Sequence, residues 1–209
     1  MKNIIFDFGG VLIAWDPDNI YKKYFANDIT KMQRFYEETG IKKVNAELDC
    51  GRPFQEALTE LSAKFPHHYE PIHLWQTRWL DMIGGPIEDS VKVLEVLRVQ
   101  GYPLYALTNW AEETFFPHIR YHDNYRFLNH FKDIVVSGVE RVIKPNPKIY
   151  KILLQRNELN PEDCVYIDDS PDNLIPAQNL GMSTIAFISP KQLISELESL
   201  GVFVNNLRS

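Results

Sequence analysis

The sequence is poor in cysteine and in long apolar runs. Its two cysteines, Cys50 and Cys164, lie far apart and form no C-x-x-C pair, which excludes a disulfide scaffold and a cysteine zinc site and favours a reducing, cytoplasmic setting. No stretch of about 18 apolar residues occurs, so we expect no membrane span. The apolar run from Ile4 to Trp15 is broken by Asp7 and has no basic lead, so we expect no secretory signal peptide.

The chain also lacks an excess of positive charge. It has 28 Asp and Glu against 22 Lys and Arg, a net charge of −6, and no basic block offsets this balance locally. Binders of nucleic acid or of anionic membranes normally carry a basic excess that neutralises phosphates, so we expect neither partner. Apolar residues are plentiful: 44% of the 209 residues are hydrophobic and 12% are aromatic. This composition indicates one compact unit, or a core that carries an insertion.

Five short runs rich in β-branched and aromatic residues predict buried strands. Each run is almost continuously apolar, as strands covered on both faces of a parallel sheet are. Helical periods lie between them, including one that opens at Asn146-Pro147 and one that opens at Ser189-Pro190. This alternation predicts an α/β fold with a Rossmann-like, doubly wound parallel sheet. The expected strands are Asn3–Phe8, Pro103–Thr108, Asp133–Ser137, Cys164–Asp168 and Thr184–Ser189.

One long region interrupts this alternation. Residues 17–83 show helical stripes and no strand pattern, and we interpret the flanking stretches, Asp16-Pro17 and Gly84-Gly85-Pro86, as hinges. We therefore predict a core formed by residues 1–16 and 84–209, with residues 17–83 inserted as a small helical cap. The apolar positions of the stripes are Phe54, Leu58, Leu61 and Phe65, followed by Ile72, Trp75, Trp79 and Met82.

Polar residues gather where the expected strands end. In an open parallel sheet, ligands bind beyond the carboxyl ends of the strands, so these positions are the ones to inspect. A carboxylate followed closely by two glycines suits a nucleophile whose backbone must approach a small anion. The motifs, in chain order, are Asp7-Phe8-Gly9-Gly10-Val11-Leu12, Thr108-Asn109, Lys144-Pro145 and Asp168-Asp169-Ser170-Pro171-Asp172-Asn173.

Taken one at a time, these motifs have ordinary structural explanations. Asp7 alone can cap a turn, and Thr108-Asn109 can cap a helix in residues 110–116. Asp168-Asp169 can form a solvated turn, although adjacent carboxylates repel each other and usually require a cation. Lys144 alone can be a surface lysine. Their joint occurrence at four strand ends favours one common site.

Together the four motifs resemble those of the haloacid dehalogenase superfamily of hydrolases. The resemblance covers nearly the whole chain, and the expected cap is inserted where many members carry a helical one. It implies a hydrolase, and with the acidic pair present we expect a Mg²⁺-dependent phosphatase that acts on a small phosphorylated metabolite. The substrate's identity and the oligomeric state are not predicted.

The resemblance implies a role for each catalytic residue. Asp7 would be the nucleophile that forms a covalent aspartyl intermediate, which divides one difficult displacement into two steps. Lys144 would hold Asp7 ionised and neutralise charge that builds on the substrate. Thr108 and Asn109 would bind the transferring group through hydroxyl, amide and backbone donors.

The resemblance also implies a metal site and a substrate pocket. A divalent cation would offset the repulsion among clustered carboxylates. We expect the backbone of Gly9-Gly10 to approach the substrate and Trp110, next in sequence to Asn109, to line the pocket. The implied Mg²⁺ ligands are Asp7, the backbone carbonyl of Gly9, Asp168 and Asp169.

One position departs from the phosphatase pattern. Phosphatases of this superfamily usually carry a second Asp two residues after the nucleophile, and Gly9 stands there instead. That Asp serves as general acid and base, a contribution typically worth about 10²–10⁴-fold. Three consequences stay open: slow turnover, a substitute residue from the cap, or a different reaction.

Two alternatives follow from Gly9. A metal-independent 2-haloacid dehalogenase also lacks the second Asp, but Asp168-Asp169 would repel its carboxylate substrate. A degenerate protein that only binds a phosphorylated ligand would need no nucleophile, so the presence of Asp7 and Lys144 counts against it. We therefore favour the phosphatase.

Overall fold

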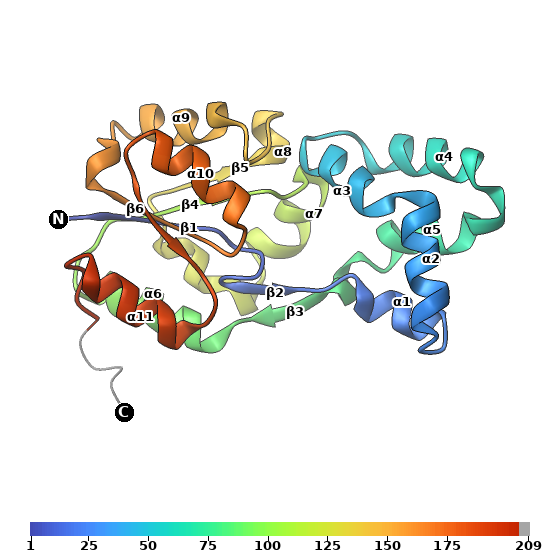
Figure 1. The fold of residues 1–209 in the computed structure, drawn as a ribbon, viewed down its shortest axis with the longest axis horizontal. Coiled ribbons are helices and arrows are strands. Elements are labelled where there is room, and N and C mark those ends of the chain that lie inside the picture. Colours follow the sequence, from blue (N-terminus) through green and yellow to red (C-terminus); the bar gives the residue numbers. More distant parts are fainter. Residues whose placement is uncertain (205–209) are drawn as a thin grey trace.

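A computed structural model describes residues 1–204, and a five-stranded parallel sheet forms its centre. The strands are β1 (Asn3–Phe6), β4 (Leu104–Thr108), β5 (Asp133–Val136), β6 (Cys164–Asp168) and β7 (Ser183–Ala186). They lie in the order β5-β4-β1-β6-β7, so the first strand of the chain is central (Figure 1). The predicted α/β class and all five predicted strands are confirmed.

Neighbouring strands are paired so that their carboxyl ends lie level. Phe6 of β1 pairs with Ile167 of β6, so Asp7 reaches the same edge of the sheet as Asp168. Thr108 ends β4 at this edge as well. The register therefore gathers three of the predicted site residues at one edge of the sheet.

Helices cover both faces of the sheet (Figure 1). Alternate side chains of β1 point into the two layers. Ile5 packs in one apolar cluster with Leu153, and Ile4 packs in the other with Leu94. The helices are α9 (Pro147–Arg156) and α10 (Pro171–Asn179) on one face, and α6 (Glu88–Val99) and α11 (Pro190–Ser199) on the other.

Two predicted helix starts are confirmed by their capping bonds. The Asn146 side chain accepts a hydrogen bond from the Lys148 amide at the start of α9, and the Ser189 hydroxyl accepts one from the Gln192 amide at the start of α11. The remaining core elements are α7 (Glu112–Phe115), a π-helical turn (Phe116–Arg120), a 3-10 helix (Asp123–His130), α8 (Ser137–Glu140) and a 3-10 turn (Pro161–Asp163).

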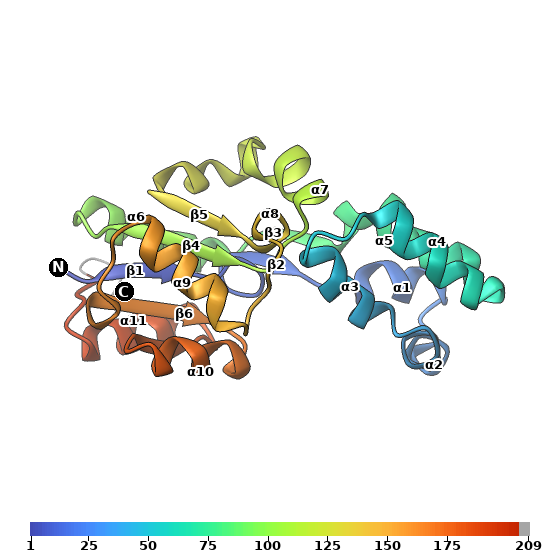
Figure 2. The same ribbon diagram turned by 90° about the horizontal axis from the view of Figure 1, so that it is seen from above.

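A helical lobe lies beyond one end of the sheet, and the strands point toward it (Figure 2). Its helices are α1 (Asp18–Tyr24), α2 (Ile29–Thr39), α3 (Ile41–Asp49), α4 (Phe54–Lys64) and α5 (Tyr69–Thr77), with 3-10 turns at Pro66–His68 and Trp79–Met82. Phe54, Leu58 and Leu61 form the buried face of α4, as their spacing predicts. The division into a core of residues 1–16 and 84–209 and a cap of residues 17–83 stays a prediction.

The connection between the lobe and the sheet differs from our expectation. Residues 84–86, which we interpreted as part of a hinge, belong to β3 (Ile83–Pro86), which pairs antiparallel with β2 (Ile13–Trp15). A Cβ atom at Gly84 would come within 2.9 Å of the Ala14 Cβ, so the close pairing depends on glycine. Glycine and proline are depleted in strands, so the sequence Gly84-Gly85-Pro86 does not predict β3.

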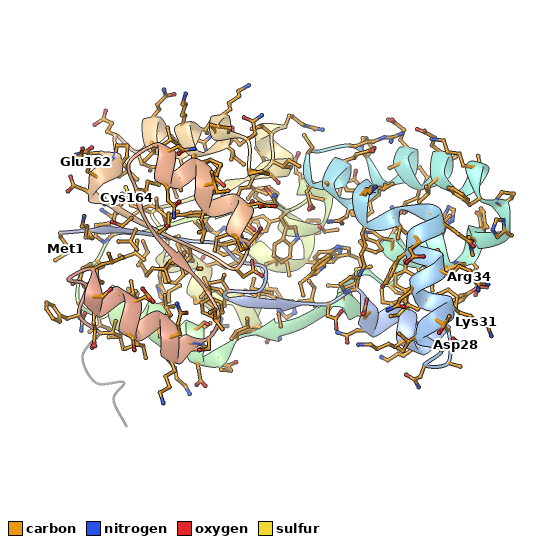
Figure 3. The ribbon with its side chains drawn as sticks, in the orientation of Figure 1. Met1, Asp28, Lys31, Arg34, Glu162 and Cys164 are labelled. Atoms are coloured by element: carbon orange, nitrogen blue, oxygen red, sulfur yellow. The ribbon has the colours of Figure 1, made fainter. Side chains whose placement is uncertain are left out.

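The two ends of the molecule are marked by labelled side chains in Figure 3. Cys164 lies with Met1 and Glu162 at the end of the core farthest from the lobe, whereas Lys31 and Arg34 lie on the outer part of the lobe. Both cysteines are free thiols. No helix within residues 1–204 has the length and apolar character needed to cross a membrane.

Candidate active site

Asp7 occupies the centre of the sheet edge, directly after β1. Its amide donates a hydrogen bond of 2.9 Å to the Ile167 carbonyl, which extends the pairing with β6 by one residue. Its side chain is buried, and Oδ1 accepts from the Phe8 amide at 2.7 Å and from Lys144 Nζ at 2.8 Å. Both of these contacts use Oδ1, and neither engages Oδ2.

Lys144 is buried at the same edge, and its ammonium makes three contacts. Nζ lies 2.8 Å from Asp7 Oδ1 and 2.7 Å from Asp168 Oδ2, and it donates to the Leu107 carbonyl at 3.1 Å. Burial acts to lower the pKa of Lys144, but the two carboxylates outweigh it and raise that pKa above its ordinary value. The ammonium therefore stays charged between the two acids.

The Asn109 side chain holds the backbone of Lys144. Asn109 Oδ1 accepts from the Lys144 amide at 2.8 Å, and Asn109 Nδ2 donates to the Lys144 carbonyl at 3.1 Å. The Asn109 side chain therefore positions Lys144 in this structure. Its expected contact with the transferring group stays a prediction.

Two buried donors near this edge have no hydrogen-bond partner within residues 1–204. They are the Thr108 hydroxyl, at the end of β4, and the indole N–H of Trp110. Buried polar groups without a partner are rare in folded proteins, and each one calls for a physical explanation. Donors held open beside a nucleophile are suited to a substrate that arrives with acceptor oxygens.

Asp168 is fully buried and uses both of its oxygens. Oδ2 accepts from Lys144 and from the Tyr166 hydroxyl, and Oδ1 accepts from the Ser170 amide at 2.8 Å. Asn173 Nδ2 donates to both oxygens, at 3.0 and 3.2 Å. Asp168 thus anchors Lys144 through Oδ2, and its expected role as a Mg²⁺ ligand stays a prediction.

The arrangement of carboxylates fits a divalent cation. Asp7, Asp168 and Asp169 each offer an oxygen within 4.8 Å of the others. Gly10 adopts a φ of 73°, and a Cβ atom there would lie 2.8 Å from Asp169 Cγ, so only glycine lets the Asp169 carboxylate come this close. Carboxylate oxygens are the ligands that Mg²⁺ prefers in proteins. The donor set present therefore suits Mg²⁺.

The same cluster perturbs the ionisation of Asp7. Burial raises the pKa of Asp7 to about 7; Lys144 opposes this rise, and the charges of Asp168 and Asp169 add to it. Burial, with Asp168 beside it, also raises the pKa of Asp169. Repulsion of this kind is relieved by a bound cation, which would favour the ionised nucleophile.

A cavity of about 200 Å³ opens beside the edge, between the core and the helical lobe. The core contributes the predicted residues Gly9, Asn109 and Trp110. Asn45 and Asp49 were not among the predicted site residues, although their four-residue spacing places both on one face of a helix. The full lining is Gly9, Trp15, Asn45, Asp49, Trp79, Asn109 and Trp110.

All predicted site residues therefore lie at the edge of the sheet or in the adjoining cavity. Asp7, Lys144 and Asp168 contact one another through the ammonium, Asp169 joins them across Gly10, and Gly9 and Trp110 line the cavity. The catalytic and metal-binding roles expected for these residues stay predictions.

The chain is similar in sequence both to a protein-family model and to individual known proteins. The family model for haloacid dehalogenase-like hydrolases matches residues 1–181. Acyl-CoA dehydrogenase family member 10 of Mus musculus is 32% identical over 214 residues, which cover 95% of this chain and 19% of that protein. D-ribitol-5-phosphate phosphatase of Bacteroides thetaiotaomicron is 26% identical over 207 residues, covering 88% of this chain and 90% of that enzyme. The chain spans less than a fifth of the length of the first curated relatives it matches.

Solved structures share the fold. A crystal structure of a haloacid dehalogenase family enzyme from Bacteroides thetaiotaomicron, a mutant in complex with magnesium and inorganic phosphate, superposes with a TM-score of 0.71. The two chains are 22% identical, and the match covers 92% of this chain and 98% of the other. The likeness extends over the sheet and the helical lobe alike.

Proposed function

The chain belongs to the haloacid dehalogenase-like hydrolases, and we propose that it is a Mg²⁺-dependent phosphatase that hydrolyses small phosphate monoesters through an aspartyl-phosphate on Asp7. One observation carries the proposal: the carboxylates of Asp7, Asp168 and Asp169 converge beside the buried ammonium of Lys144. Such a cluster suits a divalent cation with a phosphoryl group. It would repel the carboxylate substrate of a metal-free dehalogenase.

The chemistry runs in two steps on Asp7. Asp7 Oδ2 attacks phosphorus while the bond from phosphorus to the ester oxygen breaks, which leaves an acyl phosphate on the enzyme. Water then attacks the same phosphorus, and the Asp7 carboxylate departs as inorganic phosphate forms. Lys144 keeps Asp7 ionised and aimed, and the open hydroxyl of Thr108 donates to a phosphoryl oxygen.

A bound Mg²⁺ would be held by Asp7, the Gly9 carbonyl and Asp169. Asp168 completes the acidic set and supports it by fixing Lys144. The ion supplies positive charge beside the transferring phosphoryl group, which phosphoryl transfer requires.

The cavity supports a small substrate. Its volume of about 200 Å³ is below the roughly 300–1,000 Å³ typical of pockets for drug-sized ligands. The similarity to D-ribitol-5-phosphate phosphatase points to the same size class. The walls formed by Trp15, Trp79 and Trp110 offer apolar faces for the rest of the molecule.

A paired assay tests this function. Phosphate release from an aryl phosphate and chloride release from 2-chloropropionate would be measured with Mg²⁺ and with a chelator, for the wild type and for Asp7→Asn. We expect phosphate release that needs Mg²⁺ and that falls on the order of 10³-fold or more in Asp7→Asn, because the nucleophile is lost. The exposed Asp89→Asn on α6 is the matched control and should keep full activity.

Two results would contradict the proposal. Chloride release that persists with the chelator would identify a dehalogenase. Inactivity in every assay, together with tight binding of a phosphorylated ligand, would identify a binding protein.

A further inference from the structure

The proposed reaction needs a proton donor that the strand β1 motif does not supply. When the phosphorus–ester bond breaks, the leaving oxygen must be protonated, and later the attacking water must lose a proton. The residue two positions after the nucleophile is Gly9, which has no side chain. A Cβ atom built at Gly9 meets no heavy atom within 4 Å, so this position faces open space.

Asp49 shares the cavity with Gly9 and comes from the other side. It is the last residue of α3, and it lines the cavity together with Gly9 and Asn109. Among the described residues that line this cavity, Asp49 has the only acidic side chain. An acidic residue of the helical lobe therefore lines the same cavity as Gly9.

Contacts from both parts of the molecule hold Asp49 in place. Asn45, one helical turn earlier, donates from Nδ2 to Asp49 Oδ2 at 2.8 Å, and its own Oδ1 accepts from the indole N–H of Trp75 at 3.1 Å. Trp75 is fully buried, which fixes this chain of contacts. The Asp49 carbonyl accepts from the Ser137 hydroxyl of the core at 2.6 Å.

The surroundings of Asp49 also suit proton transfer. Burial in the cavity raises the pKa of Asp49 to about 7, while the Ala111 amide and the Lys144 ammonium of the core, and Asn45 on its own helix, act in the opposite direction. A carboxyl group near this pKa can give and take a proton at neutral pH, which efficient general acid–base catalysis requires.

We propose that Asp49 is the general acid and base of this site and replaces, from the helical lobe, the carboxyl group that position 9 lacks. This inference rests on the proposed phosphatase function. Protonated Asp49 gives its proton to the ester oxygen as the bond from that oxygen to phosphorus breaks and the Asp7–phosphorus bond forms, so the product leaves as a neutral alcohol.

The second step returns the proton. The Asp49 carboxylate takes a proton from water as the water oxygen bonds to phosphorus and the Asp7–phosphorus bond breaks. Inorganic phosphate leaves, and Asp49 is again protonated for the next ester. The nucleophile and the acid thus come from different parts of the chain.

The test compares two substrates that differ in their need for an acid. A nitrophenyl phosphate has a leaving group that departs readily as an anion, whereas a simple alkyl phosphate needs its leaving oxygen protonated. For Asp49→Asn we expect kcat/KM to fall about 10²–10⁴-fold on the alkyl phosphate and much less on the nitrophenyl phosphate. The control is Glu47→Gln, an exposed acid on the same helix, which should leave both values unchanged.

A second variant tests whether a carboxyl group at position 9 can stand in for Asp49. Gly9→Asp has room for its side chain, and in the Asp49→Asn background it should restore turnover of the alkyl phosphate at least about tenfold.

The outcomes separate this inference from the function on which it rests. An Asp49→Asn protein that keeps wild-type selectivity between the two substrates would overturn the role of Asp49. A gain above about 10²-fold from Gly9→Asp alone would do the same, since it would mean that the site had no acid. A wild-type protein that hydrolyses neither ester would overturn the proposed function itself, and this inference with it.

Discussion

A single buried ammonium organises the acidic residues at the edge of the sheet. Lys144 binds Asp7 and Asp168 through Nζ, while Asn109 fixes its backbone. With Asp169 included, three carboxylates face one ammonium, so the fully ionised cluster carries a formal charge of −2. A bound divalent cation would balance this charge.

Thr108→Val separates a binding role from a structural one. The Thr108 hydroxyl is buried without a partner, so valine, which has the same shape, should leave the free energy of unfolding unchanged or slightly higher. A hydrogen bond to a charged group is worth about 1.5–3 kcal/mol, so phosphatase kcat/KM should fall about 10–150-fold. Urea unfolding and steady-state kinetics would measure the two effects.

The comparison for this variant is Thr184→Val on β7, which removes a hydroxyl outside the cavity lining. That change should leave kcat/KM as it is. Wild-type activity in Thr108→Val would show that the open hydroxyl does not touch substrate.

Hydrogen bonds attach the segment between α3 and α4 to the core. Ser137 donates to the Asp49 carbonyl and accepts from the Trp110 amide at 2.9 Å. Arg141 donates to the Gly51 carbonyl, and the Phe54 amide donates to Glu113 Oε1 at 3.2 Å. Residues 49–54 therefore dock the lobe on the core independently of the β2–β3 pair.

Ser137→Ala should loosen this docking. The hydroxyl is buried, and its removal leaves the Trp110 amide and the Asp49 carbonyl without a partner, so we expect a loss of about 1–3 kcal/mol in the free energy of unfolding. Activity on an alkyl phosphate should also fall, since Asp49 loses one of its supports. Chemical denaturation and kinetics would check both.

The exposed Ser195→Ala on α11 serves as the reference for this loss, because its hydroxyl lies in solvent. Equal unfolding midpoints for the two variants would mean that Ser137 does not hold the lobe.

Elements with local signals could be predicted from the sequence, and those that depend on distant contacts could not. The five strands and the starts of α9 and α11 follow from apolar runs and capping residues such as Asn146 and Ser189. The strand β3 depends on pairing with β2, about 70 residues earlier, and its Gly-Gly-Pro sequence gives no strand signal.

The same distinction holds for the candidate site. Asp7 and Asp168 could be recognised because they lie at the carboxyl ends of β1 and β6, two strands whose register brings them together. Lys144 follows β5 only after the short helix α8, and its motif Lys144-Pro145 identified it. Asp49 lies on a helix of the lobe, and its position depends on how that lobe packs against the core. Helix packing of this kind is a tertiary property, which local periodicity does not contain.

At the scale of the whole molecule, the helical lobe faces the carboxyl ends of the strands (Figure 2). The cavity lies between them, with Gly9 and Trp110 on one side and Asn45 and Asp49 on the other. The lobe therefore contributes directly to the site, besides covering it. Substrate choice is expected to depend on lobe residues such as Trp79 as much as on the core.

The pH dependence of stability should reflect the raised pKa values of Asp7 and Asp49. Without Mg²⁺, folding raises the pKa values of Asp7 and Asp49 from 3.8 to about 7. At a pH between these two values, the folded chain therefore binds more protons than the unfolded chain. The free energy of unfolding must then fall as pH rises through this window. We expect a lower urea midpoint at about pH 7.5 than at about pH 5 in the presence of a chelator.

A variant and the addition of Mg²⁺ test this prediction further. Asp49→Asn should weaken the pH dependence, because one of the two acids is gone, and Mg²⁺ should raise the midpoint at the higher pH by binding the ionised Asp7. Glu60, whose pKa is lowered to about 2 by Lys64 and Arg52, acts below this window. A midpoint that increases from about pH 5 to about pH 7.5 in the chelator would contradict the prediction.

The β2–β3 pair also determines how the helical lobe could be replaced by another segment. Because Trp15 pairs with Ile83, the chain leaves the core and returns to it about one strand spacing apart, roughly 4.7–4.9 Å. Two residues in a tight turn can bridge that distance. Segments of very different length can therefore be grafted between these two positions without changing the register of the central sheet. A replacement lobe would need its own acid in place of Asp49 and its own contacts with the core in place of those made by residues 49–54.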